Sequence, residues 1–113
     1  MARSFGQRKL WGFVKGFVGR QNRCRLLAYQ GATKALLNAY YGRKLKKRDM
    51  RSLWIQRINA ACREQELKYN HLVCGLRQDN ITLNRKSLSE LAIHEPYSFK
   101  AIVERVKEMR GLV

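Results

Sequence analysis

The chain has 113 residues, of which 24 are Lys or Arg and only eight are Asp or Glu, so its formal net charge is +16. Residues 1–63 hold sixteen basic residues and one acid, Asp49, a net of +15; residues 64–113 hold eight basic and seven acidic residues, a net of +1. Such a charge density repels itself and predicts a polyanionic partner, with RNA or DNA ahead of an anionic membrane surface. The length leaves no room for an enzyme with a deep cleft, and no apolar run approaches a membrane span.

Strand-like alternation is scarce and proline occurs once, at Pro96, which together favour helix. We therefore predict an all-α fold: a long basic helical N-terminal extension over residues 1–65, followed by a small three-helix globular domain over residues 66–113. The three cysteines cannot all pair, which favours a reducing compartment over a secreted disulfide scaffold. A secretory signal-peptide pattern is also lacking.

The first amphipathic segment is RKLWGFVKGFVGR, residues 8–20. At about 100° per residue its apolar side chains share one arc, and its cations and three glycines lie opposite. We interpret it as a basic, Gly-lined face set against RNA phosphate. The alternatives are a helix packed on the protein's own core, and a helix for anionic lipid or organellar targeting. The apolar residues are Leu10, Trp11, Phe13, Val14, Phe17 and Val18, and the cations are Arg8, Lys9, Lys15 and Arg20.

The next segment, residues 21–65, is predicted to be one long helix or two helices joined near Gly42. Apolar residues from Leu26 to Tyr41 recur at helical spacings. The run at residues 43–51 then places cations around more than half of the helix circumference, so it cannot dock on its own domain and is either solvated or enclosed by a polyanion. These cations are Arg43, Lys44, Lys46, Lys47, Arg48 and Arg51.

Three short helices are predicted in residues 66–113. Asn70 is expected to cap the first, which runs to Gln78 and is broken at Asp79-Asn80; Asn84 is expected to cap the second. Pro96 suits the first turn of the third, and Gly111 its C-terminal cap. The predicted inward residues are Leu72, Val73 and Leu76 in the first helix, Leu88, Leu91 and Ala92 in the second, and Phe99, Ile102, Val103 and Val106 in the third.

Catalytic and metal chemistry find no support in the residue pattern. Cys62, His71, Cys74 and His94 are the only metal-like set, and their spacing matches none of the usual zinc patterns. No Gly-rich phosphate loop follows a strand, and the few carboxylates do not cluster into acid–base pairs. We predict that the chain is not an enzyme and needs no cofactor, metal or small-molecule substrate.

The strongest motif is KRDMRSLWIQRINAACR, residues 47–63. Its Lys and Arg residues can neutralise phosphates, and Asn59 can bond a base edge or a 2′-hydroxyl. Trp54 can stack on a base, or it can pack with Ile58 and Ala61 in a seam between helices. Both interpretations stay open at this point.

These residues resemble the signature of the bacterial-type large-subunit ribosomal proteins of the L-twenty family. Two more stretches are similar to the family: KGFVGR, residues 15–20, and LNRKSLSELAI, residues 83–93. The likeness covers about residues 8–110 in one order without large gaps. The signature positions are Lys47, Arg51, Leu53, Trp54, Arg57, Ile58, Asn59 and Arg63, and the third stretch matches at Leu83, Asn84, Arg85, Lys86, Leu88 and Leu91.

The resemblance implies a basic helical extension threading through ribosomal RNA, a small helical domain, and a role in early assembly of the large subunit. The implied partners are large-subunit ribosomal RNA and neighbouring ribosomal proteins, without a membrane. The candidate RNA-binding residues are Arg8, Lys9, Lys15, Arg20, Arg23, Arg25, Arg43, Lys44, Lys46, Lys47, Arg48, Arg51, Trp54, Arg57, Asn59, Arg63, Arg85 and Lys86.

The N-terminal stretch departs from bacterial members, because it is shorter and more apolar before Lys15. The stretch HEPYSFKAIVERVK, residues 94–107, is similar to mitochondrial members from plants and algae. We therefore expect a mitochondrial ribosome, with a plastid ribosome or the bacterial cytoplasm as alternatives. An N-terminus free of acids could double as an uncleaved import signal.

Overall fold

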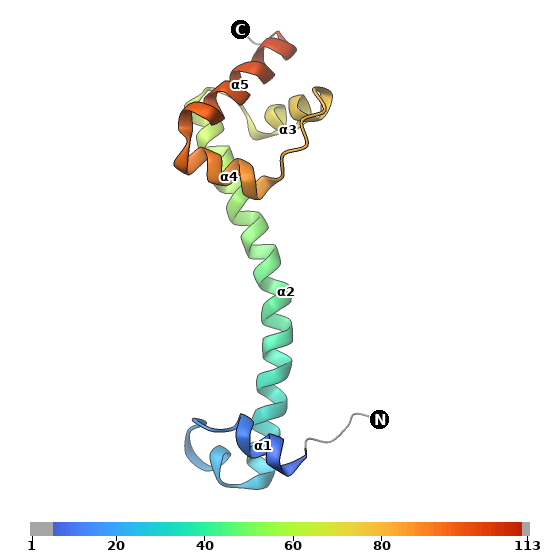
Figure 1. The fold of residues 1–113 in the computed structure, drawn as a ribbon, viewed down its shortest axis with the longest axis vertical. Coiled ribbons are helices and arrows are strands. Elements are labelled where there is room, and N and C mark those ends of the chain that lie inside the picture. The colour runs from blue at the N-terminus through green and yellow to red at the C-terminus, as the bar shows by residue number, and fades with distance from the viewer. Residues whose placement is uncertain (1–5, 112–113) are drawn as a thin grey trace. The chain divides into compact units, whose positions relative to one another are not determined.

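The computed structural model describes residues 6–111 (Figure 1). Along these residues run α1 (Gln7–Phe13), a 3-10 turn η1 (Gly19–Asn22), α2 (Arg25–Glu64), α3 (Tyr69–Gln78), α4 (Arg85–His94) and α5 (Pro96–Arg110). No strand occurs in this range, which confirms the all-α prediction. None of the described helices is both long and apolar enough to cross a membrane. The chain forms two compact units, Met1–Lys46 and Lys47–Val113, whose boundary falls within α2.

Helix α2 is one continuous helix of 40 residues that passes through Gly42 without a break. Its end is formed by Glu66, which adopts a left-handed conformation (φ 56°). The Glu66 backbone N–H donates to the carbonyl of Arg63 (3.0 Å), and the Leu67 N–H donates to the carbonyl of Cys62 (2.9 Å). These two bonds satisfy the last carbonyls of the helix, and they turn the buried Leu67 back against the core beside Cys62.

In the N-terminal unit, the prediction that residues 8–20 share one helical arc is wrong. Helix α1 ends at Phe13, and the chain then turns through Gly16 (φ 85°) and Gly19 (φ 71°). Those backbone angles suit glycine because it lacks a Cβ. The glycines therefore end the helix and lead the chain into η1.

The core of this unit is small and confirms, for three residues, the alternative in which the segment packs on its own protein. Leu10 and Val14 are buried against Ala28 and Ala32 of α2, and Phe17 packs beside them. The other apolar residues of the segment are exposed; Val18, which lies beyond the end of α1, is 89% exposed. The exposed remainder is Trp11, Phe13 and Val18.

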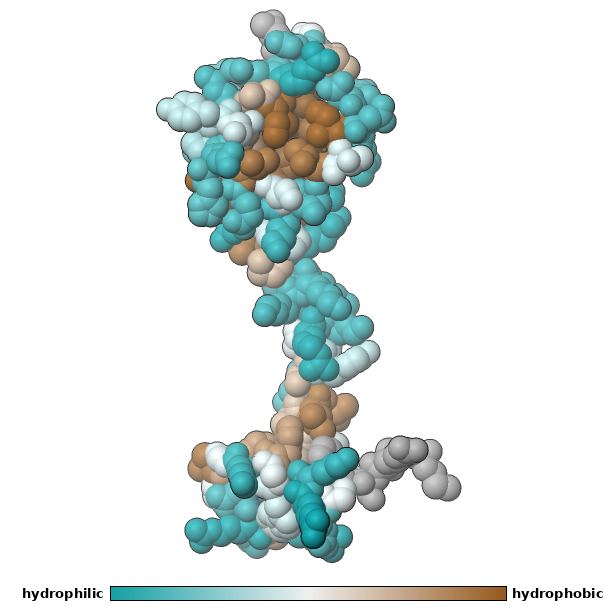
Figure 2. Space-filling model, viewed as in Figure 1, coloured by the Kyte–Doolittle hydropathy of each residue, from teal (hydrophilic) through white to brown (hydrophobic). Residues whose placement is uncertain are grey.

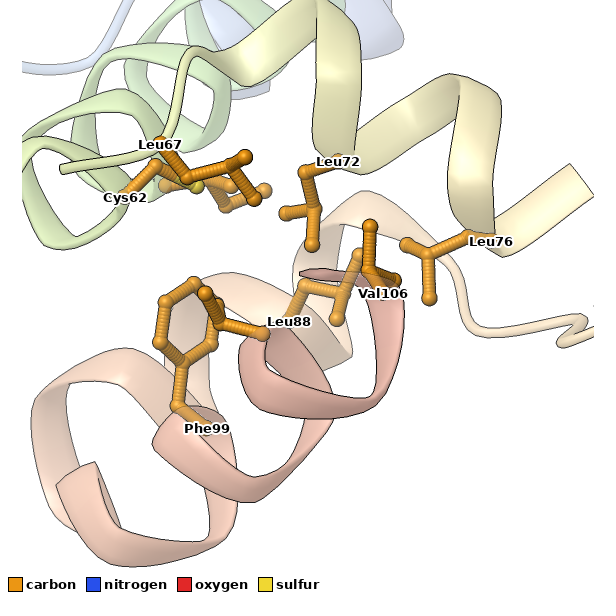
Figure 3. Close-up of a cluster of buried hydrophobic side chains, with 9 residues drawn as sticks. Cys62, Leu67, Leu72, Leu76, Leu88, Phe99 and Val106 are labelled. Carbon is orange, nitrogen blue, oxygen red and sulfur yellow. The ribbon is translucent and has the colours of Figure 1, made fainter. Parts of the chain in front are cut away.

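The C-terminal unit has a larger core, which Figure 3 shows in close-up. The last turns of α2 contribute to it, so this core begins before the residue-66 boundary expected for the domain. Ala61, Tyr69, Ile81, Ala92 and Ile102 pack around it in partly buried positions. The buried members are Ile58, Cys62, Leu67, Leu72, Leu76, Leu88, Phe99, Val103 and Val106.

Helix α3 differs from its prediction at its start. Its N-cap is Lys68 rather than Asn70, which is already the second residue of the helix. Gly75 is buried where α3 meets α5, and a Cβ built on it would overlap the side chain of Val106. Val73 is only partly buried. The close approach of the two helices therefore requires a glycine at this point.

The predicted start of α4 and both predicted ends of α5 are confirmed. The Asn84 side-chain oxygen accepts a hydrogen bond from the Ser87 backbone N–H (2.8 Å). Pro96 is the first residue of α5, and Gly111 caps its C-terminus with φ 61°. Leu91, Ala92 and Ile102 are only partly buried. In α4 the fully buried neighbour of Leu88 is the polar Ser89, whose hydroxyl has no hydrogen-bond partner among the described residues.

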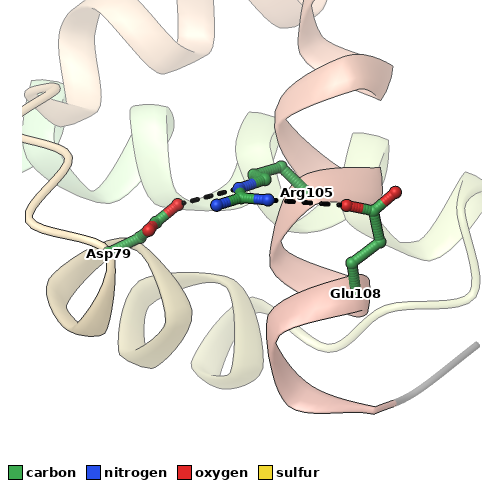
Figure 4. A network of polar contacts seen from close by, with 3 residues as sticks. All are labelled: Asp79, Arg105 and Glu108. Atoms are coloured by element: carbon green, nitrogen blue, oxygen red, sulfur yellow. Dashed lines mark hydrogen bonds and ion pairs between the residues drawn. The ribbon is translucent and has the colours of Figure 1, made fainter.

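A polar network on the surface links the end of α3 to α5 (Figure 4). The Arg105 Nε donates to the Asp79 carboxylate at 3.3 Å, and its Nη1 lies 3.7 Å from the Glu108 carboxylate. Exposed pairs of this kind contribute about 0–1 kcal/mol each. The apolar core, rather than this network, therefore dominates the stability of the C-terminal unit.

Candidate nucleic-acid interface

The predicted cations of the N-terminal unit are distributed over every element of that unit. They lie on α1, in the turn after it, in η1 and directly after it, and on the part of α2 up to Lys46, and all of them are exposed. Positive charge is therefore presented by every element of this unit rather than by one pocket. These residues are Arg8, Lys9, Lys15, Arg20, Arg23, Arg25, Arg43, Lys44 and Lys46.

In the C-terminal unit the predicted cations fall into two groups. The first group is exposed on α2 and consists of Lys47, Arg48, Arg51, Arg57 and Arg63. The second group is Arg85 and Lys86, the first two residues of α4. Arg85 is partly buried, and its Nε donates to the Tyr69 hydroxyl at 2.9 Å. Its remaining guanidinium donors are the ones available to a ligand.

The charge of residues 8–63 is not compensated within the described part of the chain. Every ion pair found in residues 6–111 uses carboxylates between Asp79 and Glu108, and none involves a cation from Arg8 to Arg63. Uncompensated cations at this density raise the electrostatic potential around the surface and attract polyanions. The arrangement can therefore bind phosphate groups at many points and shows no single centre of chemistry.

Trp54 and Asn59 are both half-buried. Their neighbour Ile58 is fully buried and Ala61 packs against the C-terminal core, so these two side chains belong to a helix–helix seam. Trp54 is only half-buried, so part of its indole is accessible to a ligand.

The thiols differ in their surroundings and do not form a metal centre. A hydrogen bond from the Leu27 backbone N–H lowers the pKa of Cys24, and the Leu26 N–H and Arg20 contribute in the same direction. Burial raises the pKa of Cys62 to about 11, and Cys74 is exposed. Among the described residues, no three His, Cys, Asp or Glu side chains gather where they could hold a metal.

One set of exposed side chains on α2 was not included in the predicted interface. Between Leu26 and Tyr41 the helix carries large apolar residues that remain 40–67% exposed. Their recurrence at helical spacings was visible in the sequence, but that spacing alone does not distinguish a buried face from an exposed one. These residues are Leu26, Tyr29, Leu36, Leu37, Tyr40 and Tyr41.

Together, the helical fold and the cations without carboxylate partners define a basic helical protein with a polyanion-binding surface. The particular family is shown by comparison with known proteins. The family model described as ribosomal protein L20 matches residues 1–102 of the chain, and the chain belongs to this family.

Relatives from distant bacteria support the assignment. The chain is 50% identical over 105 residues to large ribosomal subunit protein bL20 of Thermosipho africanus, a match that covers 93% of this chain and 89% of the relative. It is 46% identical over 108 residues to the protein of the same name from Elusimicrobium minutum, covering 96% and 92%. A third, from a Methylobacterium species, is 48% identical over 100 residues, covering 88% and 80%.

Proposed function

We propose that the chain is a structural constituent of the large ribosomal subunit, where it binds ribosomal RNA and supports early assembly of the subunit. Membership of a ribosomal protein family supports this role, and the family is structural rather than enzymatic. The observation that carries the RNA-binding part is the absence of carboxylate partners for the cations of residues 8–63 within the described chain. Neighbouring ribosomal proteins are the other expected partners.

The mechanism is charge neutralisation at many phosphates at once. Arginine suits this task because its planar guanidinium can donate two parallel hydrogen bonds to one phosphate. Cations lie on most sides of α2 between residues 43 and 51, so RNA must approach this stretch from several directions. Binding then supplies the counter-charge that the N-terminal unit lacks, and we expect RNA to hold this unit in its ordered form.

Within this function we assign RNA threading chiefly to residues 1–65 and self-contained folding to residues 66–113. The end of α2 serves both parts, because Ile58 and Cys62 belong to the C-terminal core while Arg57 and Arg63 on the same turns are exposed. Arg85 and Lys86 extend the proposed RNA surface to α4.

For the location we propose a mitochondrial ribosome. The acid-free first 48 residues and the plant-like stretch at residues 94–107 support this assignment. The relatives described above are bacterial, so a ribosome in the bacterial cytoplasm is the main alternative. Sedimentation of a tagged copy with large subunits, followed by sequencing of the RNA in that fraction, decides between them through the genome from which the RNA derives.

The RNA-binding mechanism is tested by the salt dependence of binding to large-subunit ribosomal RNA. If about eight phosphates are neutralised, log K should fall against log salt with a slope on the order of −6. The double substitution Lys47→Ala with Arg51→Ala should make the slope shallower by about 1 to 2, because two exposed cations are lost.

The same double substitution should leave the free energy of unfolding within about 0.5 kcal/mol of the parent, since both side chains are exposed. Lys100→Ala is a suitable control: its side chain is an exposed cation already paired with Glu104, and it should not change the slope. A nearly flat salt response of the parent protein would contradict the mechanism.

A further inference from the structure

Helix α2 carries an exposed apolar stripe, which we define as Leu26, Tyr29, Thr33, Leu36, Leu37, Tyr40 and Tyr41. Successive members recur at intervals that keep them on one side of a helix with 3.6 residues per turn. Each of the six large side chains is at least 40% exposed. Figure 2 shows a brown, hydrophobic patch on this part of α2 with paler surface beside it.

The stripe faces away from the core of its own unit. The buried residues of α2 in that unit are the small Ala28 and Ala32, which lie under Leu10 and Val14. The unit therefore packs its core against alanines and leaves the large residues of the same helix in solvent. Contiguous exposed apolar surface of this kind marks an interaction site more often than an accident of sequence.

The polar groups in and beside the stripe contact their neighbours on the helix. The Thr33 hydroxyl donates to the Tyr29 backbone carbonyl at 2.9 Å, which satisfies the hydroxyl within the helix. A shallow depression lined by Tyr29, Gln30, Thr33, Lys34 and Leu37 lies in the middle of the stripe. The Lys44 ammonium lies 5.2 Å from the centre of the Tyr40 ring.

The surrounding charge restricts which partner can cover this surface. No acid occurs before Asp49, while Lys34, Arg43 and Lys44 border the stripe. A second copy of the chain would bring cations against cations, which costs free energy at this density. A partner that combines apolar faces with negative charge therefore fits this surface, and unpaired nucleotides have both features.

We propose that the stripe is a stacking platform for single-stranded RNA, with bases on Tyr29, Tyr40 and Tyr41 and phosphates held by Lys34, Arg43 and Lys44. Paired bases in an A-form helix are not available for such stacking, whereas splayed bases of loops and bulges are. The leucines then cover the edges of the stacked bases. This inference rests on the proposed RNA-binding function and adds that α2 holds unpaired bases as well as phosphates.

The test compares two triple variants of the full chain. In the first, Tyr29→Leu, Tyr40→Leu and Tyr41→Leu keep the apolar surface but remove the rings. In the matched control, the same tyrosines are changed to Phe, which keeps the rings and removes only the hydroxyls. Because the side chains are exposed, both variants should retain the helical circular dichroism of the parent.

The binding probes are a fluorescent single-stranded oligouridine and an RNA hairpin duplex of equal phosphate number, measured at the same salt concentration. The Leu variant should lose about tenfold or more in affinity for the oligouridine, because base–aromatic stacking contributes strongly at each base. Its affinity for the duplex should change by less than about twofold, because that contact depends on phosphates. The Phe variant should match the parent with both probes.

Equal loss of affinity for both probes, or no loss for either, would overturn the stacking platform while leaving RNA binding intact. Failure of the parent protein to bind either RNA would instead overturn the proposed function itself. Vesicles of phosphatidylcholine and phosphatidylserine provide a third arm. Binding to them that depends on the same three rings, without an effect on oligouridine, would assign the stripe to a membrane and overturn the RNA proposal.

Discussion

The two compact units differ in how their cores are built. The N-terminal unit buries Leu10 and Val14 against two alanines of α2, whereas the C-terminal unit buries nine residues, including Phe99 and several leucines. Each fully buried large aliphatic or aromatic side chain contributes about 1.5–3 kcal/mol, so most of the self-sufficient stability lies in the C-terminal unit. The N-terminal unit has exposed cations on each of its elements and the apolar stripe, and we expect its order to depend more on a partner.

The largest expected effect is on the C-terminal core. Phe99→Ala should cost about 3–5 kcal/mol of unfolding free energy, because it removes a buried ring and leaves a cavity. The measurement is urea unfolding followed by Trp54 fluorescence in a Trp11→Phe background, so that the only tryptophan signal comes from the C-terminal unit.

The matched control for that substitution is Tyr97→Ala on the same helix, where the ring is 88% exposed. It should cost less than about 0.5 kcal/mol. Similar losses for both variants would mean that α5 does not hold the core in the way the comparison of the two units requires.

The second prediction compares the ionisation of one thiol in each unit. Burial raises the pKa of Cys62 from 9.0 to about 11. Below about pH 9 the folded and unfolded states both keep the proton; between about pH 9 and 11 only the unfolded state loses it. The free energy of unfolding should therefore fall by up to about 1.4 kcal/mol per pH unit in this window, and Cys62→Ala should remove that component.

Cys24 of the N-terminal unit should behave in the opposite way. Hydrogen bonds from backbone N–H groups, that of Leu27 foremost, lower its pKa, so it should react with iodoacetamide at a lower pH than a free cysteine. Mass spectrometry of tryptic peptides measures the alkylation of both thiols in one experiment. Alkylation of Cys62 in the folded protein near neutral pH would contradict its burial.

The smallest expected effects come from one glycine substitution in each unit. Gly75→Ala should destabilise the C-terminal unit by about 1–3 kcal/mol, because the new methyl overlaps Val106. Gly42→Ala should stabilise the protein by up to about 1 kcal/mol, because Gly42 lies within α2 and a Cβ there meets nothing within 4 Å.

Thermal melting of both variants shows directly whether each substitution raises or lowers the melting temperature. In a Val106→Ala background, Gly75→Ala should lower the stability less than it does in the parent, because the overlapping methyl groups of Val106 are gone. A destabilising Gly42→Ala would show that α2 needs flexibility at this point.

The sequence predicted those helix ends at which the chemistry of a single residue favours the observed conformation. Asn84, Pro96 and Gly111 occupy cap positions for which their chemistry is specific, and the Asp79-Asn80 break coincides with Asn80 in a left-handed conformation. Glu66 ends α2 with the same backbone conformation, but glutamate has no preference for it. That end is set instead by the burial of Leu67, a contact that local sequence cannot show.

For the candidate site, too, the sequence predicted some features and not others. Lys and Arg positions were predictable as exposed, because so many like charges cannot be buried together. The partial burial of Arg85 depends on Tyr69, sixteen residues earlier, and the exposure of Tyr40 and Tyr41 depends on tertiary packing that local sequence does not show. The burial of Ser89 contradicts the usual preference of serine for water and had no signal in the sequence.

The continuity of α2 across the unit boundary has a kinetic consequence. Starting a helix is unfavourable because several residues must be fixed before the first hydrogen bond forms, whereas adding a residue to an existing helix is close to neutral. Collapse around Ile58 and Cys62 fixes the last turns of α2 in helical form. From there the helix can lengthen toward Arg25 one residue at a time. We expect RNA to stabilise each successive basic turn by supplying its counter-charge, and the C-terminal unit to be where α2 begins to form.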